Sequence, residues 1–252
     1  MHYWQQFKLG DERMEALRVT LLSTRESNEV PQAFYALLRS VDPDAACVAI
    51  NYYSSAASSV HFGGENRLAS DTAEVLERAR AVLGGELEGE FRAAEDEPVE
   101  ERVATALSAI MDLVEPQDTA LVLKALAIAR SEECIEGAGY AAAHILEVLP
   151  PGSDKSERLI AALARAAFDE SVPHRSRWPA LGALGMSSSE TAINWLLQAL
   201  DLRTLDLQAV AGMALAELDL NRFRPRLEYM IASWPEVSDF PAYQLVALLR
   251  ES

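Results

Sequence analysis

The 252-residue sequence has only two cysteines, few aromatic residues and no long hydrophobic run. Cys47 and Cys134 stand outside any Cys-x-x-Cys or Cys/His cluster, which argues against a disulfide framework or a zinc site. We expect both to be small buried side chains in a reducing compartment. No apolar run reaches the roughly 18 residues of a membrane-spanning helix. The first residues also lack the basic-then-apolar pattern of a secretory signal, so we expect a cytoplasmic protein without a membrane segment.

Basic residues are scarce relative to acidic ones. The chain holds 39 Asp and Glu against 22 Lys and Arg, a formal net charge of −17. Such a field repels phosphate backbones, so nucleic acid is not an expected partner. Two explanations of the excess acid stay open: it keeps the chains apart in solution, or it attracts a basic partner.

Catalytic motifs are missing as well. The sequence has no Gly-rich phosphate loop, no Gly-x-Ser-x-Gly elbow and no His-Glu-x-x-His helix. Of the four scattered histidines, His144 is expected in or beside a core and His174 at the surface, and His61 in a loop. Acid pairs such as Glu132-Glu133 fall at expected helix ends, where the helix dipole explains them. We therefore expect no enzymatic activity, no metal and no cofactor.

What the sequence does contain is an apolar signature that recurs in its C-terminal two-thirds. The copies begin at residues 103, 136, 177 and 208, so they are 33, 41 and 31 residues apart. This spacing is typical of stacked helical hairpins. The four copies are Val103-x-x-Ala106-x-x-Ala109-Ile110, Glu136-x-x-Gly139-x-x-Ala142-Ala143, Arg177-x-x-Ala180-x-x-Ala183-Leu184-Gly185 and Gln208-x-x-Ala211-x-x-Ala214-Leu215-Ala216.

Each copy predicts a helix that contains the signature (A), a tight turn and a second helix (B). Small residues three positions apart line one face of the A helix and allow a neighbouring hairpin to pack closely. The A helices are expected over 98–114, 132–148, 173–185 and 203–218, the B helices over 118–130, 155–170, 189–200 and 219–231, and a closing helix over 240–250.

The chain is expected to have three parts: an N-terminal helical cap region over 1–85, an acidic linker over 86–97 and the repeat array over 98–252. Residues 86–101 contain eight acidic residues and one arginine, which favours a solvated connection or, alternatively, a docking strip for a basic partner. Within the cap region, helices are expected over about 11–25, from Pro31, over 45–53 and from 70 to 82, with a loop over 54–66.

The Arg-x-x-Ala-x-x-Ala-Leu-Gly pattern, followed by a Leu-rich helix, resembles the HEAT repeat in its bacterial phycobilisome-lyase-like variant. The resemblance covers roughly residues 98–235, with two good copies and two degenerate ones. It implies an all-α fold, a right-handed α-solenoid of HEAT-like hairpins with a divergent N-terminal cap. It implies little about activity, because such repeats serve as scaffolds, inhibitors, lyase-like chaperones and a few enzymes.

The enzymatic alternative within this architecture is the HEAT-like alkylpurine DNA glycosylase. That family would imply a basic groove with aromatic residues and a carboxylate facing flipped DNA. No stretch of this sequence reproduces its aromatic-plus-acid pattern. A second alternative is a lyase-like chaperone for a tetrapyrrole or another protein.

A partner is expected on the B helices, which generally line the binding face of such arrays. The four B spans hold eight basic and seven acidic residues, so the remainder of the chain has a net charge of −18. In the span over 189–200, Trp195 lies off the buried stripe, and it predicts either an interface anchor or a ring packed on the neighbouring repeat. The expected partner-binding residues are Trp195, Asn194, Gln198, Arg158, Arg165, Arg222, Arg226 and Tyr229.

The sequence therefore predicts a non-enzymatic protein-binding module that is monomeric. An inhibitor or immunity protein that neutralises a cognate toxin or enzyme is one form of this hypothesis, and a scaffold for a larger assembly is another. The partner itself is expected to be another protein.

Overall fold

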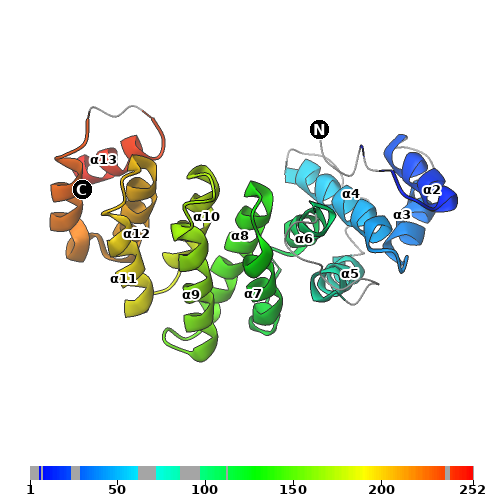
Figure 1. Ribbon diagram of the computed structural model, residues 1–252, viewed down its shortest axis with the longest axis horizontal. Helices are drawn as coiled ribbons and strands as arrows, with labels where there is room; N and C mark the ends of the chain where they lie inside the picture. Colours follow the sequence, from blue (N-terminus) through cyan, green and yellow to red (C-terminus); the bar gives the residue numbers. More distant parts are fainter. Residues whose placement is uncertain are drawn as a thin grey trace. The chain divides into compact units, whose positions relative to one another are not determined.

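The computed structural model describes Gln6 and residues 8–23, 29–61, 72–85, 97–111, 113–235 and 239–251. This part of the chain is helical and contains no strand, which confirms the predicted all-α class (Figure 1). The chain divides into two compact units, Met1–Leu113 (unit 1) and Val114–Ser252 (unit 2).

Unit 1 contains five described helices. Pro31 lies in the first turn of the second of them, where its missing N–H leaves no helical hydrogen bond unmade. Gly85 ends the fourth with a φ of 74°, a left-handed conformation that glycine adopts without strain. The helices are α2 (Glu12–Ser23), α3 (Val30–Leu38), α4 (Pro43–His61), α5 (Thr72–Gly84) and α6 (Glu97–Ile110).

Two arginines connect the helices of unit 1. Arg102 of α6 donates from Nε and Nη2 to the two carboxylate oxygens of Asp44 in α4, at 2.6 and 3.0 Å. Arg78 of α5 donates to the carbonyl oxygens of Leu38 and Ser40 at the end of α3. Because helix-end carbonyls have no partner inside their own helix, such contacts fix where α3 ends against α5.

Two expectations for the N-terminal half need correction or restriction. The loop expected over 54–66 is wrong for its first half, since α4 continues to His61. The chain has neither Gly nor Pro between Pro43 and Gly63, so small Ala and Ser residues do not end the helix. The linker expected over 86–97 lies outside the described residues except for Glu97, which begins α6. That helix, expected to open the array, packs with α4 and α5 in unit 1.

Unit 2 contains seven described α-helices and two short 3₁₀ turns. Three of these helices begin with a serine whose hydroxyl accepts a backbone N–H three residues later, at Ser131, Ser153 and Ser189. The helices are α7 (Thr119–Ile128), α8 (Glu132–Val148), α9 (Asp154–Phe168), α10 (Trp178–Leu184), α11 (Glu190–Ala199), α12 (Leu205–Ile231) and α13 (Ala242–Glu251), with 3₁₀ turns η2 (Pro116–Asp118) and η3 (Arg175–Arg177).

The break predicted between residues 218 and 219 is present inside α12. Asp219 has φ −164° and ψ 90°, which is not helical and divides α12 into segments over 205–218 and 220–231. The Asp219 carboxylate accepts the backbone N–H of Arg222 at 3.0 Å and so caps the second segment. The predicted A and B ranges in unit 2 therefore match helices, with ends that differ by a few residues.

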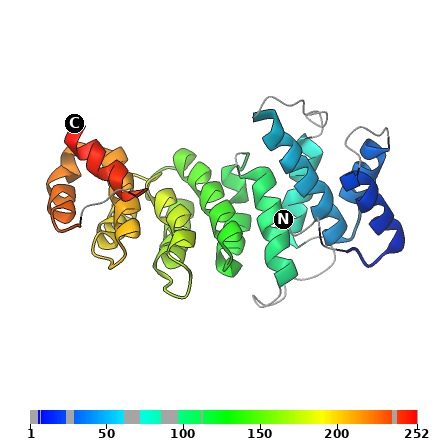
Figure 2. The same cartoon turned by 90° about the horizontal axis from the view of Figure 1, so that it is seen from above.

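The helices of unit 2 contact one another in two rows. In one row α8 contacts α10, and α10 contacts α12; in the other α7 contacts α9, and α9 contacts α11. Each hairpin joins the rows, and the helices from α7 to α12 follow one another in chain order from green to orange (Figure 2). Helix α13 packs on α12. The A-helix row is thus α8, α10 and the 205–218 segment.

The signature lies where the A helices approach each other. A Cβ added to Gly139 of α8 would be 3.0 Å from Pro179 Cβ of α10, and one added to Gly185 would be 2.8 Å from Ala214 Cβ of α12. These positions need glycine for close packing, since neither has a positive φ. The small residues therefore set the spacing of the row.

The residue at the first position of the signature has a different structural role. Arg177 is buried, and its Nε donates to the carbonyl oxygen of Ala167 near the end of α9 at 2.6 Å. Gln208 donates to the Leu202 carbonyl at 2.6 Å, and its Oε1 accepts the indole N–H of Trp234 at 2.8 Å. Arg177 thus pairs a carbonyl group in the last turn of α9, which the helix backbone leaves unpaired, and Gln208 pairs one in the segment between α11 and α12.

Candidate functional site: a groove on the A-helix row

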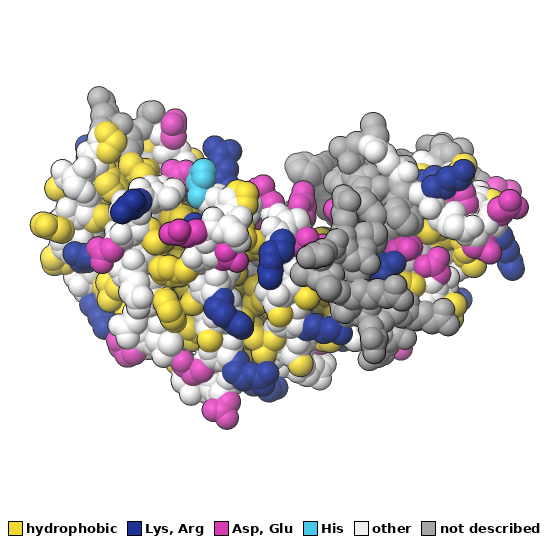
Figure 3. Space-filling view, in the orientation of Figure 1, with side chains coloured by type: hydrophobic (Ala, Val, Ile, Leu, Met, Phe, Trp, Pro, Cys, Tyr) yellow, Lys and Arg dark blue, Asp and Glu magenta, His cyan; other side chains and the backbone are white. Residues whose placement is uncertain are grey.

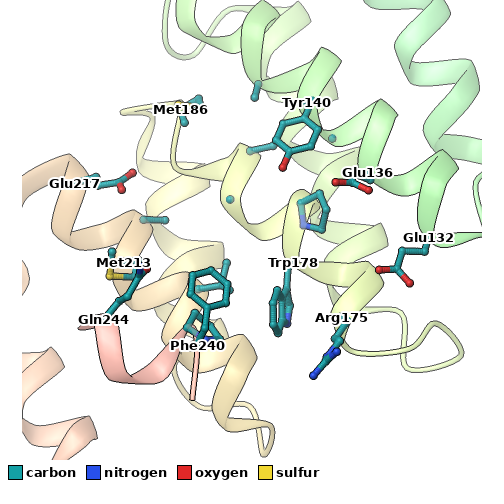
Figure 4. Close-up of a pocket in the computed structure, with 18 residues that line it drawn as sticks. Glu132, Glu136, Tyr140, Arg175, Trp178, Met186, Met213, Glu217, Phe240 and Gln244 are labelled. Atoms are coloured by element: carbon teal, nitrogen blue, oxygen red, sulfur yellow. The ribbon is translucent and has the colours of Figure 1, made fainter. Parts of the chain in front are cut away.

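A cavity of about 560 Å³ lies on the A-helix row of unit 2 (Figure 4). Its walls come from α8, η3, α10, the 205–218 segment of α12 and the start of α13. We call it the A-groove. The lining residues are Glu132, Glu136, Gly139, Tyr140, Ala143, Arg175, Trp178, Pro179, Gly182, Ala183, Met186, Val210, Met213, Ala214, Glu217, Phe240, Pro241 and Gln244.

Small residues on the face of α10 form the floor of the A-groove. Gly182 and Ala183 line it, and an added Cβ at Gly182 would have no atom within 4 Å. The signature alanines Ala143 and Ala214 extend this floor onto the neighbouring helices. The pattern that allows the A helices to pack closely therefore also leaves a hollow above them.

Large apolar side chains stand around this floor and remain accessible. Tyr140 is 48% exposed, Met186 40% and Phe240 55%. The Phe240 ring lies 5.9 Å from the ring of Trp178, and the Arg175 guanidinium lies 6.0 Å from the same indole. Exposed apolar side chains gathered in one hollow are typical of interaction sites.

The indole of Trp178 has an unusual environment. Its Nε1–H is buried and has no hydrogen-bond acceptor among the described residues. An unpaired buried donor costs about 1–3 kcal/mol, which offsets part of the stability gained by burying the ring. The ring supplies part of the aromatic wall.

Three carboxylates line the A-groove against one guanidinium. Glu132 and Glu136 come from α8 and Glu217 from α12, and none of them has an ion-pair partner in the described part of the chain. The pKa of Glu136 is raised, first by desolvation and then by the neighbouring charges of Glu132 and Glu133. The groove is therefore apolar at its floor and negative on two of its walls.

The predicted partner-binding residues lie elsewhere, on the row formed by α9, α11 and the 220–231 segment. None of the eight lines the A-groove. Asn194, Gln198, Arg158 and Arg165 are exposed, and Tyr229 is 75% exposed. These exposures agree with the sequence pattern.

Two of the predicted arginines are already paired with acids of neighbouring segments. The Arg222 guanidinium lies 3.3 Å from the Glu190 carboxylate, and Arg226 Nη2 donates to Asp201 Oδ1 at 2.6 Å. Both pairs are solvent-exposed, so each contributes less than about 1 kcal/mol. Their charges are nonetheless partly neutralised.

Trp195 has a ring contact of the kind that the second of its two predictions describes. It is half-buried, and its ring lies 5.4 Å from that of Phe168 in the preceding B helix. Packing between α9 and α11 therefore accounts for part of the burial of this side chain. Its polar neighbours Asn194 and Gln198 stay at the surface.

Charges of both signs are mixed on the face of unit 2 that Figure 3 presents, with hydrophobic patches between them. A second, smaller hollow of about 190 Å³ is lined by Arg130, Arg165 and Asp169, among others. The pKa of Asp169 is lowered by hydrogen bonds from the hydroxyl and backbone N–H of Ser171. This hollow thus has both signs of charge within it.

The structure describes the side chains of His144, His174 and both cysteines. His144 is half-exposed beside Glu147, and His174 is exposed with Nε2 3.4 Å from Asp206, while the side chain of His61 lies outside the described residues. Cys47 and Cys134 are not joined in a disulfide and both are buried as predicted, and burial raises the pKa of the Cys47 thiol. No group of three or more metal-binding side chains occurs in the described ranges. Among the same ranges, no helix has the length and apolar character needed to cross a bilayer.

The A-groove was not among the sites that the sequence predicts, although one residue of the signature pointed to it. The first signature position holds Arg177 and Gln208 in two copies, where each pairs a carbonyl, but Glu136 in another. A carboxylate cannot donate to a carbonyl when it is ionised, so Glu136 departs from the structural role. It instead faces the groove from α8 (Figure 4).

Comparison of the chain with protein-family models, curated proteins and solved structures found no match.

Proposed function

We propose that this protein is a non-enzymatic protein-binding module and that unit 2 is a right-handed array of HEAT-like hairpins that holds a segment of its partner in the A-groove. Three features support the array: the two rows of contacting helices, the recurrence of the signature at the A-helix contacts, and the repeated carbonyl pairing by Arg177 and Gln208. An inhibitor, an immunity protein and a scaffold are all forms of this proposal.

The observation that carries the proposal is the exposure of Tyr140, Met186 and Phe240 around one hollow of about 560 Å³. Leaving large apolar groups in water costs roughly 25 cal/mol for each Å² that could otherwise be buried. A soluble chain keeps such a cluster where it gains from contact with another molecule. Aromatic side chains in a hollow are also the groups that dominate protein interfaces.

The charges of both faces disfavour the other candidates. Three carboxylates in the A-groove repel a phosphate backbone, and Arg222 and Arg226 on the opposite row are paired with acids. A glycosylase-like groove would need the reverse balance. A tetrapyrrole with carboxylate side chains would meet the same repulsion in the A-groove.

A substitution that fills the space above the groove floor tests the proposal. Gly182→Leu places a large side chain into the A-groove, and the open space around a Cβ at this position predicts a stable fold. Asn194→Leu adds the same side chain to an exposed site on the opposite row and serves as the matched control. Affinity capture from the native host, followed by quantitative mass spectrometry, compares the two variants with the wild type.

We expect Gly182→Leu to lose a partner that both the wild type and Asn194→Leu retain. Thermal melting checks that both variants are folded. If Gly182→Leu is folded and retains every partner, the A-groove is not the binding site. Loss of the partner by Asn194→Leu alone would instead locate binding on the B-helix row.

A further inference from the structure

We infer that the A-groove accepts a segment of the partner in which an apolar side chain is flanked on both sides by Lys or Arg. This inference rests on the proposed function and specifies the chemistry of the partner. It follows from how the carboxylates and the apolar side chains are arranged around α10.

The carboxylates occupy opposite sides of the groove. Glu136 lies on the α8 side and Glu217 on the α12 side, with the floor of α10 between them (Figure 4). Glu132 lies one helical turn before Glu136 on the same helix. No described basic side chain pairs with any of the three, so an incoming cation would provide their first ion pair.

The neighbouring negative charges on α8 make a bound cation favourable on this side of the groove. Burial and the charges of Glu132 and Glu133 hold the pKa of Glu136 above its ordinary value. This means that the ionised form is disfavoured where it stands. A bound ammonium or guanidinium group removes that repulsion, whereas a bound anion would increase it.

The space between the carboxylates suits an apolar side chain. Gly182 of α10 lines the floor between the carboxylates, Met213 and Ala214 line the α12 side, and Phe240 and Tyr140 add apolar surface to the groove. Methionine side chains adapt to varied shapes, which suits a site that receives an aliphatic or aromatic residue. A basic–apolar–basic order in the partner matches the carboxylate–apolar–carboxylate order across the groove.

The open walls favour a peptide segment over a small molecule. In the A-groove, Tyr140, Met186 and Phe240 all keep at least 40% of their surface in solvent. A chain that continues beyond the groove in both directions can cover these rims, and a compact ligand on the floor cannot.

Fluorescence anisotropy with short labelled peptides tests the inference. The probes are Gly/Ser-rich peptides with a central Lys-Leu-Lys, Lys-Ser-Lys or Glu-Leu-Glu. We expect Lys-Leu-Lys to bind most tightly, because it alone supplies both the cations and the apolar group. Raising the salt concentration should weaken this binding, since exposed charges are screened over about 8–10 Å at physiological ionic strength.

Substitutions in the protein test whether the Lys-Leu-Lys peptide binds in the A-groove. Glu136→Gln and Glu217→Gln should each weaken Lys-Leu-Lys binding by roughly twofold to fivefold, the range for a partly exposed ion pair. Gly182→Leu should abolish binding by filling the apolar middle. Glu157→Gln removes a carboxylate from α9 outside the A-groove and should change nothing.

The outcomes separate this inference from the proposed function. If Gly182→Leu loses the native partner but Glu-Leu-Glu binds as well as Lys-Leu-Lys, the groove is the site and the inferred chemistry is wrong. No binding of Lys-Leu-Lys up to millimolar concentration, or equal weakening by Glu157→Gln and Glu136→Gln, would also overturn the inference. Loss of partner capture by Asn194→Leu alone would overturn the proposed function itself.

Discussion

The contact between Gly185 and Ala214 predicts the effect of a single added methyl group. In Gly185→Ala, the new Cβ would lie 2.8 Å from Ala214 Cβ and 3.3 Å from Ala214 Cα. Carbon atoms in contact are about 3.5–4.0 Å apart, so α10 and α12 must separate locally. Over-packing of this kind costs about 1–3 kcal/mol, and the lower entropy of the unfolded alanine chain offsets about 0.4–1 kcal/mol of it.

Gly185→Ala should therefore destabilise unit 2 by about 0.5–2 kcal/mol, which lowers its Tm by roughly 2–8 °C for a unit of this size. Gly182→Ala, three residues earlier, is the matched control, because nothing lies within 4 Å of its Cβ. Alanine in place of a helical glycine should stabilise by about 0.5–1 kcal/mol. Denaturant unfolding followed by circular dichroism measures both variants.

A second substitution tests the cause. Combining Gly185→Ala with Ala214→Gly removes the methyl group that the new Cβ meets. The double variant should be more stable than the sum of the two single changes predicts. Equal stability of Gly185→Ala and Gly182→Ala, or strict additivity in the double variant, would refute the close approach of α10 and α12.

Two further predictions concern paired side chains. Arg177→Met removes the buried hydrogen bond to the Ala167 carbonyl and should lower the free energy of unfolding, measured with denaturant, by about 1.5–3 kcal/mol. Arg175→Met, at an exposed position nearby, should lower it far less. Equal losses in the two variants would contradict the carbonyl-pairing role of Arg177. Arg18 lowers the pKa of Glu15 from 4.5 to about 2, chiefly through a hydrogen bond. The ionised carboxylate therefore stabilises unit 1 at pH values above 4.5, and this contribution is lost as the pH falls toward 2. Glu15→Gln should therefore be less stable than the wild type at neutral pH and approach it in acid unfolding below pH 4.5; a difference independent of pH would argue against this pairing.

Much of the helical organisation is predictable because its signals are local. A serine cap such as Ser131, a first-turn proline such as Pro31 and a terminal glycine such as Gly85 act on backbone groups within a few residues. Asp219 shows the same for the break inside α12. The sequence predicts the end of α4 too early because Ser favours caps and turns while Ala favours helix, and tertiary packing decides whether such a run stays helical.

The A-groove is harder to predict because its walls come from distant parts of the sequence. Tyr140 and Phe240 are separated by a hundred residues, and the helical pattern of each segment says nothing about their shared hollow. How far the Trp195 ring is exposed was hard to predict for the same reason, because the ring it contacts, Phe168, belongs to another helix. The pattern of small residues predicted close helix packing but not the space that packing leaves above Gly182.

Two methionines allow the central claim, that the A-groove holds the partner, to be tested directly. Met186 and Met213 line the groove, whereas Met230 lies in the 220–231 segment on the opposite row. In a protein labelled with ¹³C at the methionine methyl groups, addition of the captured partner should shift or broaden the Met186 and Met213 signals and leave Met230 unchanged. Unmoved Met186 and Met213 signals in the presence of bound partner would contradict the claim and place the partner outside the A-groove.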